Sequence, residues 1–175
     1  MRKVKVIPYC ENWKHLFEEE TTKLEKIFGS EILHIHHIGS TSIEGLKAKP
    51  IIDIMPVVKD INVIDHFINK MMAIGYTAKG ENGIIGRRYF QKGGDMRTHH
   101  VHIYEIGSFE IERHLAFRDF LRVHKKMANK YGDLKEKLSF RYPYDIVSYI
   151  LGKEQLGSEI ETLALKWYQE RVEFR

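Results

Sequence analysis

The sequence has few features that would stabilise it covalently or place it in a membrane. It contains one cysteine, Cys10, which excludes an intramolecular disulfide framework. The first ten residues, MRKVKVIPYC, lack the apolar run of a secretory signal. Charged or polar residues interrupt every apolar stretch well before the roughly 18 residues that a membrane-spanning helix requires. We therefore expect a cytoplasmic protein with no membrane partner.

A large excess of charge of one sign is also missing. The 175 residues include 28 Lys and Arg against 24 Asp and Glu, which gives a formal net charge of +4. This balance tolerates an anionic ligand, but it lacks the dense basic stripe with interleaved exposed aromatic residues that is typical of nucleic-acid binders. A nucleic-acid partner is therefore disfavoured. The hydrophobic content of 43% is sufficient for one domain with a sizeable core.

Hydrophobic spacing predicts an α/β region followed by helices alone. Before about residue 107 it predicts helices over 11–28 and 61–74, and strands over 31–38, 49–58, 83–92 and 98–105. The last two strands are expected to pair antiparallel through a turn at 92–95, because its glycines can adopt positive φ. From about residue 108 we expect three helices, the last of them broken at Gly157 with Ser158 as a new N-cap. The expected organisation is one domain over 1–175, with an α/β core over about 1–107 and a helical annex over about 108–175.

A glycine turn rich in hydroxyl residues follows the first strand. Within HHIGSTSIEGLKAKPIIDI, the chain leaves the strand through glycine, and the backbone N–H groups and two serine hydroxyls of such a turn can converge on an anion. A lysine shortly before the next strand can reach a phosphate as a flexible point charge, or it can be a solvated surface lysine. A turn without a ligand is the alternative, because short motifs have many false positives. The candidate phosphate-binding residues are Gly39, Ser40, Thr41, Ser42 and Lys49.

Possible metal ligands lie on two of the predicted strands. Asp53 follows the glycine turn on an apolar strand and is placed to hold a Mg²⁺ ion that bridges to bound phosphates. His100 and His102 alternate onto one face of the strand 98–105, whereas His99 points the other way. Carboxylates suit magnesium, but a pair of imidazoles suits zinc, nickel or manganese-like ions. The alternative is that these are half-buried, hydrogen-bonded strand histidines without a metal.

Three further side chains are candidates for the same pocket. His37 precedes the glycine turn and can orient it. Arg118 and Arg122 are four residues apart on one predicted helix, so together they form a forked cation suited to phosphate or carboxylate. Arg118 and Asp119 can equally form an ion pair that ties the helical annex to the sheet, and that structural reading is slightly favoured, with Arg113 and Arg122 as possible ligand contacts.

Several long motifs together resemble the GrpB family over nearly the whole chain. They are HIGSTSIEGLKAKPIIDI, HHVHIYE, ERHLAFRDFLRVH and the pair Tyr149 and Lys153. The family is similar in fold to nucleotidyltransferases, which implies a mixed β-sheet flanked by helices. The resemblance also implies a Gly-Ser phosphate element at Gly39 and Ser40 and a metal carboxylate at Asp53. Domains of this family also occur fused to dephospho-CoA kinase, which points weakly towards nucleotide or coenzyme metabolism.

The sequence departs from these patterns at two places. Ile51 and Met55 flank Asp53 at the spacing where active nucleotidyltransferases carry a second acidic residue, and Glu44 replaces a proline that is usual in the family. A two-metal phosphoryl-transfer site needs several oxygen ligands, so the missing carboxylate weakens the case for activity. Glu44, Glu105 or the strand histidines are the available substitutes.

The sequence therefore predicts an enzyme that binds a nucleotide or another phosphorylated small molecule. Ser40 and the local backbone would hold phosphate, Asp53 would bind Mg²⁺ or Mn²⁺, and Lys49 would neutralise charge during nucleotidyl transfer to a small acceptor. Two alternatives stay open. One is a zinc-dependent phosphate-ester hydrolase that uses His100 and His102 with Asp53, and the other is a non-catalytic nucleotide-binding or regulatory module.

Overall fold

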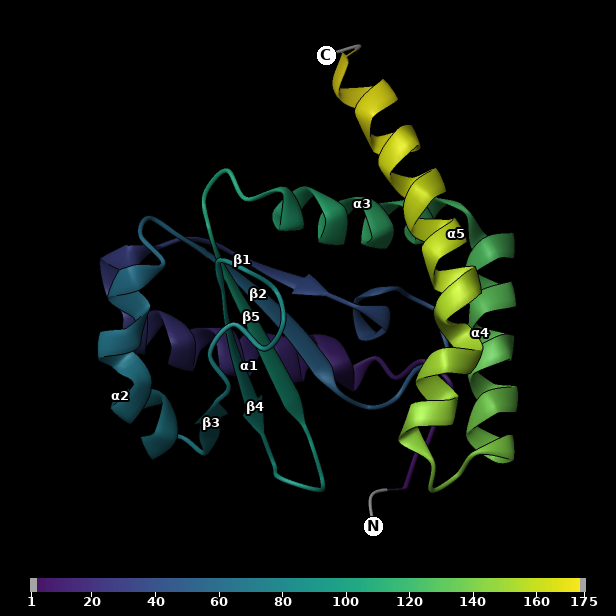
Figure 1. The fold of residues 1–175 in the computed structure, drawn as a ribbon, viewed down its shortest axis with the longest axis horizontal. Coiled ribbons are helices and arrows are strands. Elements are labelled where there is room, and N and C mark those ends of the chain that lie inside the picture. The colour runs from purple at the N-terminus through teal and green to yellow at the C-terminus, as the bar shows by residue number, and fades with distance from the viewer. Residues whose placement is uncertain (1–2, 174–175) are drawn as a thin grey trace. The chain divides into compact units, whose positions relative to one another are not determined.

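The computed structural model describes residues 3–173 and contains a mixed five-stranded sheet flanked by helices (Figure 1). The strand order is β1-β2-β5-β4-β3, in which β2 and β5 are parallel and the other neighbours are antiparallel. The strands are β1 Ile32–Ile38, β2 Ile52–Val58, β3 Tyr76–Ala78, β4 Arg87–Lys92 and β5 His99–Glu105. The helices are α1 Asn12–Phe28, η1 Gly29–Glu31, η2 Ser40–Ser42, η3 Asn62–Phe67, α2 Ile68–Ala73, α3 Phe109–Val123, α4 Lys125–Arg141 and α5 Ile146–Glu173. The predicted mixed α/β fold class is confirmed.

The chain divides into two compact units. The sheet unit comprises Glu11–Ile38 and Ile51–Ile111, and the helical unit comprises the described parts of Met1–Cys10, Gly39–Pro50 and Glu112–Arg175. The helical unit therefore contains two segments from the first 50 residues, including the glycine turn. Across residues 3–173, none of the helices combines the length and apolar character needed to cross a membrane.

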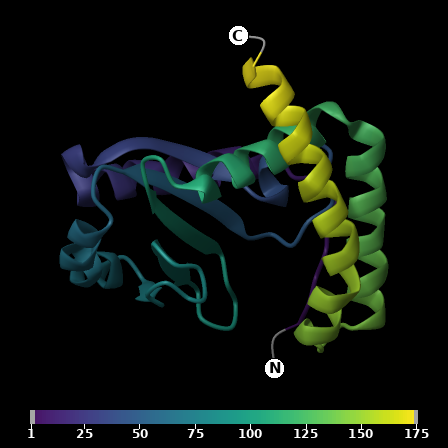
Figure 2. The same cartoon turned by 45° about the horizontal axis from the view of Figure 1, so that its top comes forward.

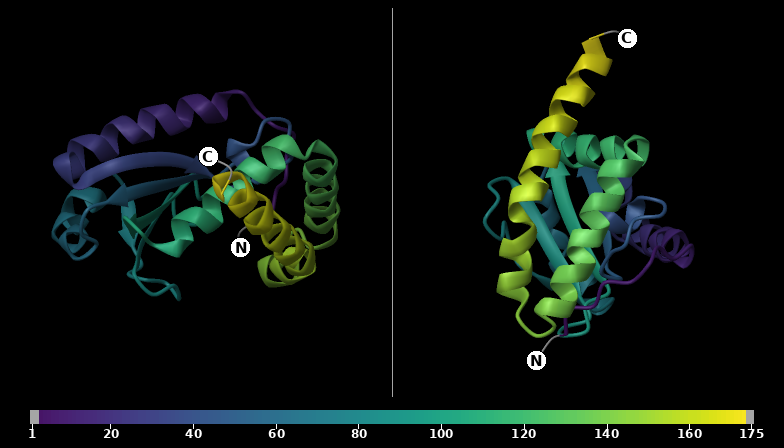
Figure 3. Two further views of the ribbon diagram at one scale, coloured as in Figure 1. Left: turned by 90° about the horizontal axis from the view of Figure 1, so that it is seen from above. Right: turned by 90° about the vertical axis from the view of Figure 1, so that its right-hand side faces the viewer.

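Apolar burial in the sheet unit follows from the strand and helix patterns. β2 is buried on both faces, as its nearly continuous apolar run predicts. α1 lies along β1 and β2 (Figure 3), and its buried apolar residues recur at helical spacing before Gly29 ends it with φ 54°. The buried apolar side chains of α1 and β2 are Trp13, Leu24, Phe28, Ile52, Ile54, Met55, Pro56, Val57 and Val58.

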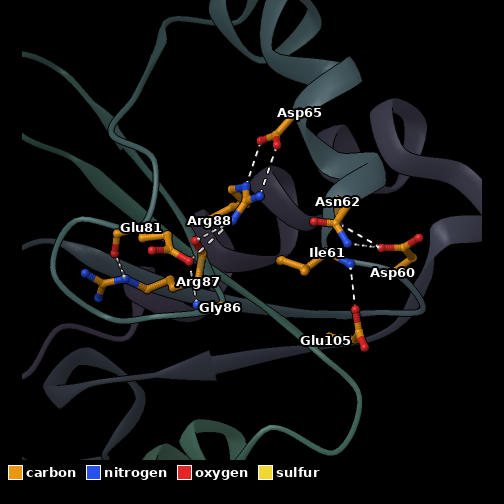
Figure 4. Close-up of polar contacts among 9 residues, drawn as sticks. All are labelled: Asp60, Ile61, Asn62, Asp65, Glu81, Gly86, Arg87, Arg88 and Glu105. Carbon is orange, nitrogen blue, oxygen red and sulfur yellow. Dashed lines mark hydrogen bonds and ion pairs between the residues drawn. The ribbon is translucent and has the colours of Figure 1, made fainter.

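The sequence predicted one α-helix over 61–74. The structure instead has the 3-10 helix η3 followed by the short α2. The Glu105 carboxylate accepts a hydrogen bond from the Ile61 N–H at 3.0 Å (Figure 4). Arg88 on β4 donates two hydrogen bonds to the Asp65 carboxylate, at 2.7 and 3.0 Å. These contacts tie the start of η3 and its Asp65 to neighbouring strands, a constraint that apolar spacing does not reveal.

In the helical unit, α4 and α5 lie side by side (Figure 2). The predicted break at Gly157 is wrong, because α5 continues through this residue to Glu173. One buried cluster includes three α5 residues at a spacing of four, Leu156, Ile160 and Ala164. This packing stabilises a continuous helix on both sides of Gly157. A Cβ at Gly157 would lie 3.9 Å from the Tyr131 hydroxyl of α4.

The predicted hairpin between β4 and β5 is confirmed. The Met96 N–H donates to the Gly93 carbonyl at 2.9 Å, and the Thr98 N–H donates to the Lys92 carbonyl at 3.0 Å. Gly93 has φ 96°, and a Cβ there would lie 2.4 Å from the Met96 carbonyl oxygen. The turn thus requires glycine at this position for both its backbone conformation and its close approach.

Gly93→Ala is expected to lower the free energy of unfolding by about 2–3 kcal/mol, because the new methyl group must displace backbone in addition to adopting positive φ. Gly94→Ala is the matched control. Gly94 has φ 55°, and a Cβ there would have no atom within 4 Å, so only the backbone cost of about 1 kcal/mol applies. Urea denaturation of the two variants checks this difference, and equal losses would contradict the steric explanation.

Candidate functional site

A carboxylate and two imidazoles meet on one face of the sheet. Asp53 on β2 is the register partner of His100 on β5, and His102 lies two residues further along the same face. The Asp53 Oδ1 atom is 3.0 Å from His102 Nε2 and 3.3 Å from His100 Nδ1. One ligand atom from each residue lies within 4.8 Å of the others. We call Asp53, His100 and His102 the His–Asp cluster.

The cluster is partly enclosed and its carboxylate is ionised. The side chains of Asp53, His100 and His102 are 27%, 15% and 13% exposed. Burial by itself would raise the pKa of Asp53, but hydrogen bonds with His100 and His102, and their positive charge when protonated, lower that pKa well below its usual range. Asp53 is therefore a carboxylate at neutral pH, the form that a metal ligand requires.

The donor set of the cluster fits a divalent transition metal. A set of two ring nitrogens and one carboxylate oxygen binds zinc and similar ions in preference to magnesium. Three protein ligands also leave coordination positions for water or substrate. The Nε2 atom of His100 is buried and makes no hydrogen bond within the described chain. The strand register places both histidines on the same face of the sheet as Asp53.

Tyr89 on β4 is a neighbour of the cluster that the sequence analysis missed. It is the register partner of His102, and its ring centroid lies 5.0 Å from that of His102 and 5.6 Å from that of His100. The Tyr89 hydroxyl accepts a hydrogen bond from the Gln91 side-chain amide at 3.0 Å. Burial raises the pKa of Tyr89, so the phenol stays protonated at neutral pH. The hairpin turn was a usable signal, since it determines which β4 residues face the histidines.

Three other polar residues of the strands, the candidates His37 and Glu105 and also His99, lie on the opposite face from Asp53. His99 points away from the cluster, as predicted, and its ring bonds to the Thr98 hydroxyl at 2.9 Å. The ring of His37 stacks on Phe17 of α1 at a centroid distance of 4.7 Å. Glu105 caps η3 through the Ile61 N–H, so its carboxylate does not join the cluster either. Local contacts account for all three side chains.

The glycine turn of the helical unit is closed by its own hydrogen bonds. Gly39 adopts φ 68°, and its carbonyl accepts from the Ser42 N–H at 3.2 Å and from the Ser42 hydroxyl at 2.6 Å. The sequence suggested that the Ser40 and Ser42 hydroxyls converge on an anion. Instead, the Ser42 hydroxyl donates within the turn, whereas the Ser40 hydroxyl faces a side chain of another element. That side chain is Lys135 of α4, whose Nζ lies 2.7 Å from the Ser40 Oγ.

Arg122 holds the turn rather than standing free for a ligand. Its Nε and Nη2 atoms donate to the Ser42 carbonyl at 3.1 and 2.8 Å. Arg118 pairs through Nε with the carboxylate of Asp119 at 2.7 Å. These printed contacts of the two arginines lie within the helical unit, so the expected tie between the annex and the sheet stays a prediction. Their predicted contact with a phosphate stays a prediction.

The two remaining candidates of this segment have contacts with the helices. The Lys49 ammonium lies over the Tyr149 ring, 5.2 Å from its centroid. Glu44 is exposed, and its backbone carbonyl accepts a hydrogen bond from the Lys125 ammonium at 3.3 Å. The predicted phosphate role of Lys49 and the predicted metal role of Glu44 stay predictions.

Comparison with known proteins decides the family. The model of the family described as GrpB protein matches residues 3–162. The chain belongs to the GrpB family. A crystal structure of the conserved protein GrpB from Enterococcus faecalis is similar, with a TM-score of 0.92 and 43% identity, and covers 94% of this chain and 99% of that one. The resemblance of the motifs to GrpB is thereby confirmed.

Two GrpB-family relatives differ in how much of their length this chain matches. The UPF0157 protein YqkA of Bacillus subtilis is 52% identical over 97% of this chain, which spans 50% of that protein. The glutamate-rich protein GrpB of Alkalihalophilus pseudofirmus is 35% identical over 89% of this chain and 92% of its own length. The chain thus spans half of the first relative and nearly all of the second.

Proposed function

We propose that this GrpB-family chain is a metal-dependent enzyme that acts on a nucleotide or another phosphate ester. The observation that carries the proposal is the His–Asp cluster, in which three ligand atoms from two neighbouring strands lie within 4.8 Å of one another. A carboxylate paired with imidazoles on rigid strands is the arrangement from which divalent-ion sites are built. The ionised state of Asp53, with its lowered pKa, supports the same conclusion.

In this proposal, different residues of the chain would bind the metal ion and the phosphate. A bound divalent ion would supply Lewis-acid polarisation of a phosphoryl oxygen. Asp53 would contribute the negative charge that holds the ion, and His100 and His102 would contribute nitrogen ligands that restrict its position. The glycine turn, with the Ser40 hydroxyl, is the element proposed to bind phosphate oxygens. Nucleotidyl transfer to a small acceptor is the reaction that the family resemblance favours.

A second candidate function is hydrolysis of a phosphate ester with a transition metal. The nitrogen-rich ligand set favours this alternative, because Asp53 has Ile51 and Met55 at the positions where a second acidic residue would support two magnesium ions. The ion that binds distinguishes the two reactions. Preference for magnesium supports transfer, and preference for zinc supports hydrolysis.

Thermal denaturation with added ions tests the proposal. Zn²⁺, Mn²⁺ or Mg²⁺ is expected to raise the melting temperature, because a ligand at 100 times its Kd stabilises the folded state by about 2.7 kcal/mol. Asp53→Ala should abolish this increase, whereas the control Asp95→Ala, at an exposed residue of the β4–β5 hairpin, should retain it. ATP, GTP, CTP, UTP and CoA precursors are then added with and without the ion. A protein that no ion stabilises would refute the metal site, and one that binds the ion but no phosphorylated ligand would refute the substrate class.

A further inference from the structure

Lys135 is a buried cation in the middle of α4. The residue is only 3% exposed, and its ammonium lies 4.7 Å from the centroid of the Tyr131 ring and 2.7 Å from the Ser40 Oγ. Burying a lysine is costly unless its charge is used, because desolvation disfavours the charged form. Helical periodicity alone does not distinguish this residue from the other lysines of α4.

The attachment of α4 to the glycine-turn segment does not depend on Lys135. Lys47 bonds the carboxylates of Asp133 and Glu136 on α4, at 3.0 and 2.6 Å. A Cβ at Gly132 would lie 3.1 Å from the Leu46 side chain, so the helix already packs closely on this segment. An apolar side chain at position 135 would satisfy packing at a lower desolvation cost. These contacts attach α4 to the glycine-turn segment in addition to the Lys135 ammonium.

The hydrogen bond between Lys135 and Ser40 has a defined direction. The ammonium has only N–H donors, so the Ser40 oxygen must accept the hydrogen bond from Lys135. The hydroxyl proton of Ser40 is consequently directed away from Lys135 and is available for another acceptor. An oxyanion at Ser40 would receive this O–H donor and the field of the nearby ammonium together, the combination found in strong charge-assisted phosphate contacts.

We propose that Ser40 and Lys135 form a phosphate subsite in the helical unit, with Lys135 as a ligand-contacting residue that binds the anion without a metal ion. The subsite rests on the proposed function for its substrate class, a nucleotide or other phosphate ester. It assigns the role of the phosphate-binding lysine to Lys135, a residue that lies far from the glycine turn in the sequence. The turn positions the hydroxyl and α4 positions the cation.

Calorimetric titration with pyrophosphate in the presence of EDTA tests this subsite apart from the metal. The parent protein should bind pyrophosphate, and Lys135→Met should weaken binding about 10- to 100-fold because an ammonium contact is lost while the aliphatic stem is kept. The matched control is Lys137→Met, two residues along α4 at an exposed position, which should bind as the parent does. Ser40→Ala should also weaken binding, and it serves as the measured variant if Lys135→Met does not fold.

The outcomes separate the subsite from the proposed function. Parent-like pyrophosphate affinity in Ser40→Ala and in folded Lys135→Met would overturn the subsite, as would a parent protein that does not bind pyrophosphate in EDTA. Zn²⁺ binding by Lys135→Met should equal that of the parent, because the cation of the helical unit is not a ligand of the His–Asp cluster. If the parent protein does not bind Zn²⁺, the metal site is refuted, whereas the conclusion drawn from pyrophosphate binding is unaffected.

Discussion

Glu20→Ala is expected to lower the free energy of unfolding by about 3 kcal/mol, which is the effect of removing one partner from a buried ion pair. Glu20 is 2% exposed on α1. Its two carboxylate oxygens accept hydrogen bonds from Lys92 of β4 at 2.7 Å and from Lys23 of α1 at 2.9 Å. Alanine would leave the Lys92 ammonium, 22% exposed, without this carboxylate. Urea denaturation at neutral pH measures the loss.

The same ion pairs make stability depend on pH in a definite direction. Burial would raise the pKa of Glu20, but the hydrogen bonds from Lys92 and Lys23 lower it overall from its ordinary value of 4.5. A carboxyl group with a lowered pKa in the folded state stabilises the protein above its unfolded pKa and loses that contribution as pH falls through the folded value. The difference between the parent and Glu20→Ala should therefore shrink below about pH 4.5.

Two further variants establish that the cost comes from a buried pair. Glu19→Ala changes an exposed neighbour on α1 and should cost less than about 0.5 kcal/mol. The double variant Glu20→Leu with Lys92→Met removes both charges and should recover most of the stability, since apolar replacement of a buried pair is often neutral. A double variant as unstable as Glu20→Ala would instead indicate that Glu20 acts through packing.

Strand alternation explains why the two histidines of the His–Asp cluster could be predicted to share a face, whereas the burial of Glu20 could not be predicted. Alternation along HHVHIYE is enough to place His100 and His102 on one face, whatever strand lies beside them. The run of three glutamates at 18–20 reads as a solvated helix face, and only the position of Lys92 on β4 reveals that the third is buried. Periodicity reports which residues share a face, but it does not report which charged residues meet across elements.

Two errors in the predicted secondary structure have separate physical causes. β3, Tyr76–Ala78, was not predicted because three residues are too few to show alternation, and its pairing with β4 supplies the hydrogen bonds that define it. The break predicted in α5 followed from the local preference of Gly157, which the apolar stripe on both sides of it overrides. Local propensity was thus reliable at Gly29 and Gly93, where the backbone has positive φ, and unreliable where the glycine lies in a helix.

The two chemical features of the chain have different origins in the sequence. The His–Asp cluster combines residues 53, 100 and 102, which only the parallel pairing of β2 with β5 brings together. The Ser40–Lys135 contact joins positions 95 residues apart, and it depends on the packing of α4 on the glycine-turn segment. The turn motif and the strand pattern could each be recognised from the sequence, whereas the partner of Ser40 required the fold.

His102→Ala is expected to reduce the affinity for Zn²⁺ by about 100-fold or more, because loss of a ligand should exceed the 10- to 100-fold effect of mutating an outer-shell partner. The control is His99→Ala, three residues earlier on β5 but on the opposite face of the sheet. This variant removes an imidazole of the same strand without removing a ligand, so it should bind zinc as the parent does.

Competition titration with a chromophoric chelator measures the zinc affinity, and the visible absorption of bound Co²⁺ reports the ligand geometry. The Co²⁺ spectrum should change in His102→Ala and be unchanged in His99→Ala, since only the former alters the donor set. Equal losses in the two variants would show that zinc binds through general histidine content, and unchanged affinity in His102→Ala would exclude the cluster as the site. A loss confined to His102→Ala requires a metal held on the face of the sheet that carries Asp53, which is the condition for metal-dependent chemistry in this chain.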